Sequence, residues 1–244
     1  MAKTILTNDD GIDAPGLAAL YLASESLGPR IVVAPHTVRS GSGHAVTTRD
    51  PLIVTKTREG WFSTTGMPAD CARVALTRLA PDAEWVLSGI NRGGNLGADT
   101  YISGTVAAAR EAALLGKQAI AFSQYVRSDL EIDWSWTQRQ TTRTLEQLLA
   151  LPPDPTAFWN VNFPHVPLPA PDPEIVFCGL DLNPLDVGFE DGETIGEDSR
   201  LMHYTGTYHG RPRARGRDVA VCFEGAIAVT RIPLDITGQS ASCR

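Results

Sequence analysis

Three short apolar runs in this sequence each end in a polar turn, and this arrangement constrains the fold more than any other feature. The runs are Thr4–Thr7, Arg30–Ala34 and Trp85–Leu87. Segments with helical periodicity separate or follow them, at Pro15–Leu27, Ala69–Leu79 and Thr105–Leu115. Short buried strands that alternate with helices are typical of a parallel sheet with helices on both faces. We therefore predict an α/β fold built on a mostly parallel sheet.

The remaining segments fit the same plan. Ala119–Phe122 and Phe158–Val161 are predicted strands, and Trp134–Leu149 is a predicted helix. Within Pro51–Thr65, β-branched and aromatic residues lie on both sides of Arg58-Glu59-Gly60. This pattern predicts a hairpin attached to the main sheet.

A cluster of prolines marks a boundary in the chain. Eight of the 17 prolines fall between Pro152 and Pro173, which favours extended connections over regular helix. The next 45 or so residues hold short strand-like pieces with many Gly and Asp, more chain than a doubly wound sheet needs. We predict an α/β catalytic core over residues 1–164, an extension at 165–218 that serves as an oligomerisation arm, and a segment at 219–244 that returns to the core or a partner.

Composition excludes several classes of protein. The 244 residues include 21 Lys and Arg against 28 Asp and Glu, and the resulting net charge of −7 disfavours binding to a nucleic-acid polymer. No apolar run approaches the roughly 18 residues of a membrane span, and no secretory signal is apparent. We expect a cytoplasmic protein, because the cysteines show neither zinc nor disulfide spacing. These are Cys71, Cys178, Cys222 and Cys243.

Two adjacent acids, Asp9 and Asp10, follow the first apolar run in a turn that ends at Gly11. In parallel sheets, ligands collect at the carboxyl ends of strands where the strand order reverses. Two neighbouring carboxylates there repel each other unless a cation or a proton lies between them. A turn or helix-cap role is the alternative for either acid. Their position after a buried strand favours a hard ion such as Mg²⁺ or Mn²⁺.

The turn after the second run, Val38–His44, contains two glycines. Gly41 and Gly43 let backbone amides approach an anion, and Ser40 could add a neutral oxygen to the same metal. The turn lacks the third glycine of a dinucleotide fingerprint, so it is a poor match to that motif.

The third turn is predicted over Ser88–Gly97, with four glycines in ten residues. It leads to Ser103-Gly104-Thr105 at the start of the Ala-rich helix. Free N–H groups at a helix N-terminus form a ready anion site, whereas the alternative is an ordinary Ser or Thr helix cap. Three polar turns after three strands would converge at one edge of the sheet.

An acidic protein repels phosphate, so a phosphate-handling site here needs a divalent cation to reverse the local charge. Asp9 and Asp10 would hold the cation, which would polarise a phosphoryl oxygen and activate a water. Amides near Ser103–Thr105 would stabilise the equatorial charge. These residues imply hydrolysis of a phosphomonoester. Two alternatives remain. One is a phospho-aspartyl enzyme with Asp9 as the nucleophile, although the usual Asp-x-Asp spacing of such enzymes is absent here. The other is a nucleotide-binding regulator.

Six segments together resemble the SurE survival-protein family of metal-dependent nucleoside-monophosphate phosphatases. The block from Asn91 to Thr105 is the most specific part of the match, and the resemblance extends over most of the chain. The segments are Thr7–Gly16, Val32–Thr47, Gly66–Ala72, Leu87–Gly116, Trp159–Pro164 and Asp218–Leu234.

The resemblance implies a Rossmann-like core with a C-terminal extension that is used in homodimers or homotetramers. It implies one divalent metal ion per subunit, Mg²⁺ or Mn²⁺, with Asp9 and Asp10 as the catalytic residues. The implied substrates are nucleoside 5′- and 3′-monophosphates, with looser action on other phosphate esters and on short polyphosphate. The implied metal ligands are Asp9, Asp10, Ser40 and Asn91, and the implied phosphate-binding residues are Asn95, Ser103, Gly104 and Thr105. Gly41 of the second turn is also predicted to bind phosphate, because it lets backbone amides approach an anion.

Several positions depart from the family pattern or have no assigned role. His36, Met67 and Ile102 stand where the family commonly has Asp, Thr and Tyr, positions that bear on substrate preference and subunit contact. His44 lies beside the second turn and is interpreted either as a residue near the site or as a surface histidine. The alternating arginines of Arg211–Arg217 are interpreted as a solvated loop in preference to one face of a strand.

Overall fold

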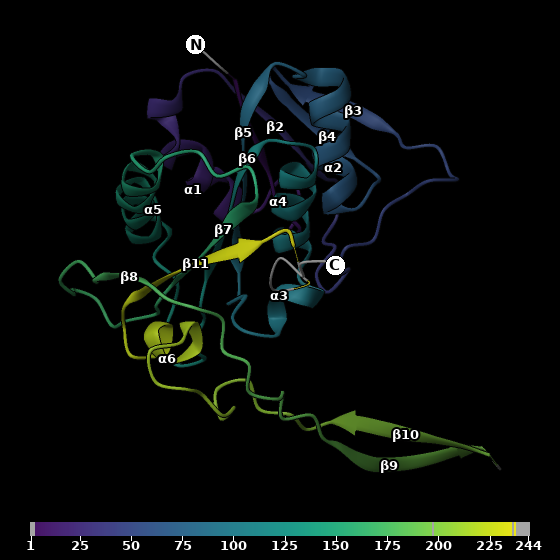
Figure 1. Ribbon diagram of the computed structural model, residues 1–244. Helices are drawn as coiled ribbons and strands as arrows, with labels where there is room; N and C mark the ends of the chain where they lie inside the picture. Colours follow the sequence, from purple (N-terminus) through teal and green to yellow (C-terminus); the bar gives the residue numbers. More distant parts are fainter. Residues whose placement is uncertain (1–2, 197, 236, 238–244) are drawn as a thin grey trace, which may run out of the picture.

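The computed structural model describes residues 3–196, 198–235 and 237, and its centre is a sheet with helices on both faces (Figure 1). Within these residues the main sheet has nine strands, in the order β3-β4-β2-β1-β5-β6-β7-β11-β8. In the same order, their bounds are Val54–Arg58, Trp61–Thr64, Arg30–Pro35, Lys3–Thr7, Ala83–Arg92, Gln118–Gln124, Ala157–Phe163, Ile227–Pro233 and Ile175–Phe177.

Strand β1 lies where the strand order reverses. It pairs in parallel with β2 on one side and β5 on the other, and β6 and β7 continue the parallel part. The carboxyl ends of β1, β2 and β5 therefore meet at one edge, the usual place for a ligand in such sheets. The β3–β4 hairpin is antiparallel and joins β2 through β4. The predicted α/β fold with a mostly parallel, Rossmann-like sheet is confirmed.

Adjacent residues of β1 show how both faces of the sheet are covered. Leu6 belongs to an apolar cluster that includes side chains of α1 and α5, whereas Ile5 belongs to a cluster with α2 and α4. Successive side chains of a strand point to opposite faces, so the apolar pair fits a strand buried on both sides. The helices are α1 (Pro15–Ala23), α2 (Pro68–Val74), α4 (Gly104–Leu114) and α5 (Trp134–Leu149).

Two predicted helices differ in detail from the observed ones. The predicted helix at Ala69–Leu79 is divided into α2 and a π-helical turn over Ala75–Leu79. The one predicted at Pro15–Leu27 is divided into α1 and a 3₁₀ turn over Glu25–Leu27. The helix predicted at Trp134–Leu149 has the bounds of α5.

The prediction that a turn begins at Ser88 is wrong. Strand β5 continues to Arg92, because its pairing with β6 resumes at Asn91 after an irregularity that follows Ser88. Ile90 is fully buried in the core and holds this part of the strand in place. Asn91 therefore projects from the end of a strand, and the glycine-rich loop begins after it.

The chain after β7 first returns to the sheet and then leaves it. Strand β8 lies at the sheet edge beside β11, whereas β9 (Phe189–Gly196) and β10 (Ser199–Tyr204) pair with each other and project from the body (Figure 1). Helix α6 (Asp218–Phe223) then leads into β11, which pairs with β7. The division at residues 164 and 218 and the oligomerisation role stay predictions.

The described residues contain neither a disulfide nor a helix that could span a membrane. Cys71, Cys178 and Cys222 are free thiols, and Cys243 lies outside the described residues. No helix in the described part of the chain combines the length and hydrophobicity needed to cross a membrane. The cytoplasmic location stays a prediction.

Candidate active site

A cavity of about 370 Å³ lies at the sheet edge where β1, β2 and β5 end. Predicted site residues from the three turns and from the start of α4 line this one cavity. Three other predicted residues, Asp10, Gly104 and Thr105, are not part of its lining. The lining members of the predicted set are Asp9, Ser40, Gly41, Asn91, Asn95 and Ser103.

Asp9 is the most buried acid of the predicted metal site, with 3% of its surface exposed. Its Oδ1 accepts a hydrogen bond from the Thr105 hydroxyl, and its backbone carbonyl accepts one from the Arg39 N–H at 2.7 Å. Burial, aided by the charge of Asp10, raises the pKa of Asp9 from 3.8 to about 6. Among the described residues Asp9 forms no ion pair. A bound cation would stabilise this isolated carboxylate.

Asp10 and Asn91 are connected through the end of β5. Oδ2 of Asp10 accepts a hydrogen bond from the Arg92 backbone N–H at 2.8 Å, and burial raises the pKa of this acid too. The side-chain N–H of Asn91 donates to the Gly93 carbonyl at 2.8 Å. The Asn91 amide oxygen is therefore left for another partner.

The oxygen atoms of these residues fit a hard divalent cation. Asp9 and Asp10 offer carboxylates, Ser40 a hydroxyl and Asn91 an amide oxygen, a donor set typical of Mg²⁺ or Mn²⁺. No group of three or more His, Cys, Asp or Glu that could hold a metal occurs within the described ranges. A cation here would therefore depend on neutral oxygens beside the two acids.

Helix α4 begins against Asp9. The Ser103 hydroxyl caps it by accepting a hydrogen bond from the Val106 N–H at 3.1 Å, so the helix-cap alternative is confirmed. Ser103 also lines the cavity. A Cβ at Gly104 would lie 2.9 Å from both Asp9 Cβ and Ser42 Oγ, which is closer than real Cβ contacts. Glycine thus lets the N–H groups of the first helical turn approach the cavity.

Asn95 is fixed by side chains from two neighbouring strands. Its Nδ2 donates to Ser123 on β6 at 2.7 Å, and its backbone N–H donates to Oδ1 of Asn162 on β7 at 2.8 Å. Nδ2 atoms of Asn160 and Asn162 donate in turn to the Asn95 carbonyl. These contacts give the asparagines of the Trp159–Pro164 segment a structural role in holding the glycine-rich loop.

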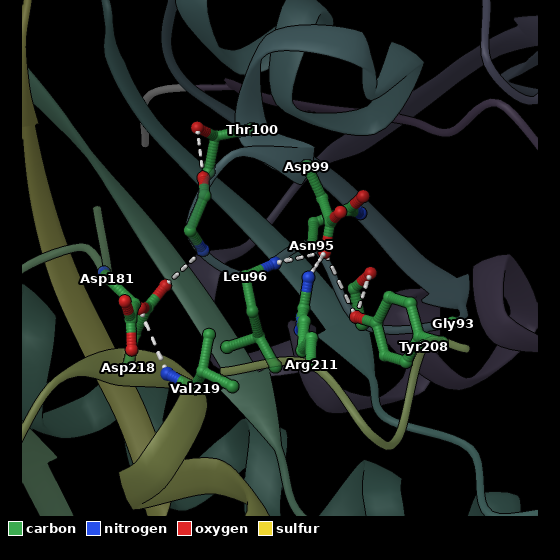
Figure 2. A network of polar contacts seen from close by, with 12 residues as sticks. Gly93, Asn95, Leu96, Asp99, Thr100, Asp181, Tyr208, Arg211, Asp218 and Val219 are labelled. Carbon is green, nitrogen blue, oxygen red and sulfur yellow. Dashed lines mark hydrogen bonds and ion pairs between the residues drawn. The ribbon is translucent and has the colours of Figure 1, made fainter. Parts of the chain in front are cut away.

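A polar network ties that loop to the C-terminal part of the chain (Figure 2). Oδ2 of Asp99, in α3 (Asp99–Ile102), accepts hydrogen bonds from Arg211 at 2.8 Å and from the Tyr208 hydroxyl at 3.1 Å. The Tyr208 hydroxyl also lies 3.0 Å from the Gly94 carbonyl. The loop that follows β5 is therefore bonded to residues more than 100 positions later.

This network could not be predicted from the sequence. Arg211 is only 6% exposed, so its interpretation as part of a solvated loop is wrong, although Arg213, Arg215 and Arg217 are exposed. Its partner Asp99 lies 112 positions earlier, and no local pattern connects the two. The alternation of arginines gives no sign of which one is buried.

Asp218 makes a second connection between the glycine-rich loop after β5 and the C-terminal part of the chain (Figure 2). Its Oδ2 accepts a hydrogen bond from the Gly97 N–H at 2.7 Å, and its Oδ1 accepts one from the Asp181 N–H at 2.6 Å. Burial raises the pKa of Asp218. This carboxylate thereby holds the glycine-rich loop, the start of α6 and the chain after β8 together.

His44 does not line the cavity. Its Nε2 lies 2.7 Å from Oε2 of Glu111, a buried residue of α4 whose Oε1 accepts from Arg73 Nε at 2.6 Å. His44 therefore supports the loop that carries Ser40 from the side of α4.

The base of the extension forms another part of the cavity wall. This wall is partly apolar, and Ile102 of α3, 56% exposed, lies beside it. A ligand bound through the residues after β1 would face this wall. Its residues are Leu185, Asp186, Tyr204, Gly206, Thr207, Tyr208 and Arg211.

Proteins of one family are similar to this chain over most of its length. Residues 4–180 match the family model described as survival protein SurE. A Synechocystis protein with a provisional 5′-nucleotidase name is 45% identical over 93% of this chain and 98% of its own, and the 5′-nucleotidase SurE 1 of Burkholderia lata is 37% identical over 99% and 94%. The crystal structure of the SurE protein from Aquifex aeolicus, 29% identical, superposes with a TM-score of 0.85 over 97% of this chain and 95% of that chain. The chain therefore belongs to the SurE family.

Proposed function

We propose that this chain is a divalent-metal-dependent phosphatase that hydrolyses nucleoside 5′-monophosphates, and 3′-monophosphates as well, to nucleoside and phosphate. The observation that carries the proposal is the single cavity that combines the isolated Asp9 carboxylate, the oxygens of Ser40 and Asn91, and the start of α4. The name of the relative from Burkholderia lata, a 5′-nucleotidase, supports the same activity.

Asp9, Asp10, Ser40 and Asn91 would hold the cation. When bound, it would supply Lewis acidity toward the phosphoryl group and make water a stronger acid. The Thr105 hydroxyl keeps one carboxylate oxygen of Asp9 in a fixed direction. The acids are thus oriented before a ligand arrives, which lowers the cost of organising the site.

The phosphate would bind on the side of Asn95, Ser103, Gly104 and Thr105. Backbone N–H groups at the start of α4 donate to phosphate oxygens without a positively charged side chain, and the helix dipole adds to the attraction. Such preorganised donors stabilise the charge that develops on the equatorial oxygens during transfer to water. The part of the extension wall that holds Leu185 and Tyr204 would then contact the nucleoside.

Removal of divalent ions tests the metal requirement. We expect EDTA to abolish phosphate release from AMP and GMP, because the two acids then repel the phosphate, and we expect Mn²⁺ or Mg²⁺ to restore it. Phosphate release is measured with 5′- and 3′-monophosphates in parallel. Undiminished turnover in EDTA after exhaustive chelation would contradict the metal assignment, and turnover of 5′ substrates alone would contradict the 3′ activity.

The extension would pair with a second copy of this chain. The isolated β9–β10 hairpin exposes more than half of Phe189, Ile195 and Met202, and a two-stranded hairpin is marginally stable by itself. A second copy that covers these side chains would give the homodimer or homotetramer.

Charged substitutions on the hairpin test this assembly. We expect the double variant Ile195→Glu/Met202→Glu to fall to the mass of a single chain in size-exclusion chromatography with light scattering, because two buried carboxylates would oppose the contact. Leu114→Glu, at an exposed apolar residue of α4, is the matched control and should leave the mass unchanged. A wild-type protein that is already monomeric at tens of micromolar would refute the assembly.

A further inference from the structure

Arg211 carries hydrogen-bond donors that the protein itself does not use. Its side chain is 5% exposed and lines the candidate active-site cavity. One terminal nitrogen, Nη1, donates to Asp99 at 2.8 Å. Nε and Nη2 are buried and have no hydrogen-bond partner among the residues that the structure describes. Buried donors without a partner are rare in native proteins, and a catalytic role or a bound water or ion is a common explanation for them.

The guanidinium is held in place on two sides. Oδ2 of Asp99 binds one end, and Cζ of Arg211 lies over the Tyr208 ring, 4.1 Å from the ring centroid. Figure 2 shows the three side chains together. Tyr208 is itself fixed through its hydroxyl to Asp99 and to the Gly94 carbonyl. Little side-chain entropy therefore remains to be lost when a ligand binds the free donors.

The chemistry of the free donors points to an anion. Guanidinium groups bind carboxylate and phosphate oxygens through paired N–H donors, and such charge-assisted bonds are about twice as strong as neutral ones. The same cavity holds Asn95 and Ser103, the residues assigned to phosphate. The phosphate of a nucleoside monophosphate has three strong acceptor oxygens, so it can accept hydrogen bonds from Arg211 as well as from the amides of α4.

We propose that Arg211 is a substrate-binding catalytic residue that donates hydrogen bonds to the phosphate of the nucleotide, with Asp99 as the residue that positions it; this rests on the phosphatase function proposed above. In the reaction, water adds to phosphorus, the bond from phosphorus to the sugar oxygen breaks, and the nucleoside leaves with a proton. Arg211 transfers no proton. Its charge offsets the negative charge that the phosphoryl oxygens carry in the transition state.

Inorganic phosphate is the probe for this assignment, because it is the product and needs no turnover. With Mn²⁺ present, we expect Arg211→Gln to raise the dissociation constant of phosphate about 10- to 100-fold in calorimetry, and to lower kcat/KM for AMP about 100- to 1000-fold. Arg213→Gln, at an exposed arginine of the same segment, is the matched control and should change neither value.

Two further variants separate contact with phosphate from a purely structural role. Arg211→Lys can still pair with Asp99, so its melting temperature should approach that of the wild type, while phosphate affinity recovers only in part because the fork of donors is lost. Asp99→Asn should weaken phosphate binding in the wild-type background and have little further effect in Arg211→Gln, which a double-mutant cycle measures. Full recovery of phosphate affinity by Arg211→Lys, or additive effects in the cycle, would overturn the assignment.

The results for the wild type and for Arg211→Gln test the role of Arg211 separately from the proposed phosphatase activity. Wild-type hydrolysis of AMP together with unchanged phosphate affinity in Arg211→Gln would reject the role of Arg211 and leave the phosphatase proposal intact. A wild-type protein that neither hydrolyses AMP nor binds phosphate with Mn²⁺ would reject both. If Arg211→Gln does not fold, the phosphate affinity of the Arg211→Lys variant decides the question.

Discussion

Asp9→Asn is expected to abolish AMP hydrolysis while making the metal-free protein more stable. The amide keeps the size of the carboxylate and an oxygen that accepts from the Thr105 hydroxyl, but it removes the buried charge. We expect kcat/KM to fall at least about 1000-fold, since a charged metal ligand is lost. The rise of the Asp9 pKa from 3.8 to about 6 means that ionised Asp9 lowers the free energy of unfolding by about 3 kcal/mol at pH 7 in EDTA. Asp9→Asn removes this cost.

The sign of the pH dependence follows from the same shift. Because the pKa of Asp9 is higher in the folded than in the unfolded state, the folded protein binds the proton more tightly. The cost of the ionised form is fully present above about pH 6 and disappears as the pH falls below 3.8. The difference in melting temperature between Asp9→Asn and wild type in EDTA, about 5 °C or more at pH 7, should therefore shrink toward pH 4.

Asp13→Asn is the matched control for this variant. Asp13 is exposed on the same loop, so its substitution removes one charge without touching the cavity, and both activity and melting temperature should stay at wild-type values. Mn²⁺ should raise the melting temperature of wild type and Asp13→Asn but not of Asp9→Asn. Normal turnover by Asp9→Asn would remove the basis of the metal assignment.

The parts of the site that could be predicted from sequence are those set by local pattern and topology. Apolar runs such as Ile5-Leu6 identify strands buried on both sides, and the alternation with helices makes the sheet parallel. Parallel strands then bring the turns that carry Asp9, Ser40 and Asn95 to one edge, as the cavity shows. This convergence follows from strand direction and needs no knowledge of side-chain packing.

The parts that could not be predicted depend on contacts between distant segments. Arg211 is buried because Asp99 and Tyr208 receive it, and nothing near Arg211 in the sequence distinguishes it from exposed Arg213. The end of β5 could not be predicted for a related reason, because it depends on packing in the core. Gly89 and Ser88 have turn-like composition, but the burial of Ile90 keeps the strand going past them.

Gly16 combines a feature that the sequence predicts with a cause that only the structure shows. Its place in the Thr7–Gly16 motif identifies it as a candidate motif residue, and Pro15 before it is a typical first helical residue. The reason for glycine appears only in the structure, where a Cβ at Gly16 would lie 1.9 Å from the Ile90 carbonyl oxygen of β5 and 3.1 Å from the Trp134 ring. Helix α1 thus packs directly on the strand that ends in Asn91.

We expect Gly16→Ala to destabilise the fold by about 3 kcal/mol or more, because α1 must move away from the β5 backbone and the core opens between them. Thermal denaturation should show a fall in melting temperature of about 6 °C or more. Gly196→Ala is the matched control, since a Cβ there meets no atom closer than 3.7 Å, and its effect should stay within about 0.5 kcal/mol. Because Ile90 directly precedes Asn91, the folded fraction of Gly16→Ala should also bind Mn²⁺ less tightly than wild type. A Gly16→Ala protein with wild-type melting temperature would show that α1 does not lie against β5 as closely as described.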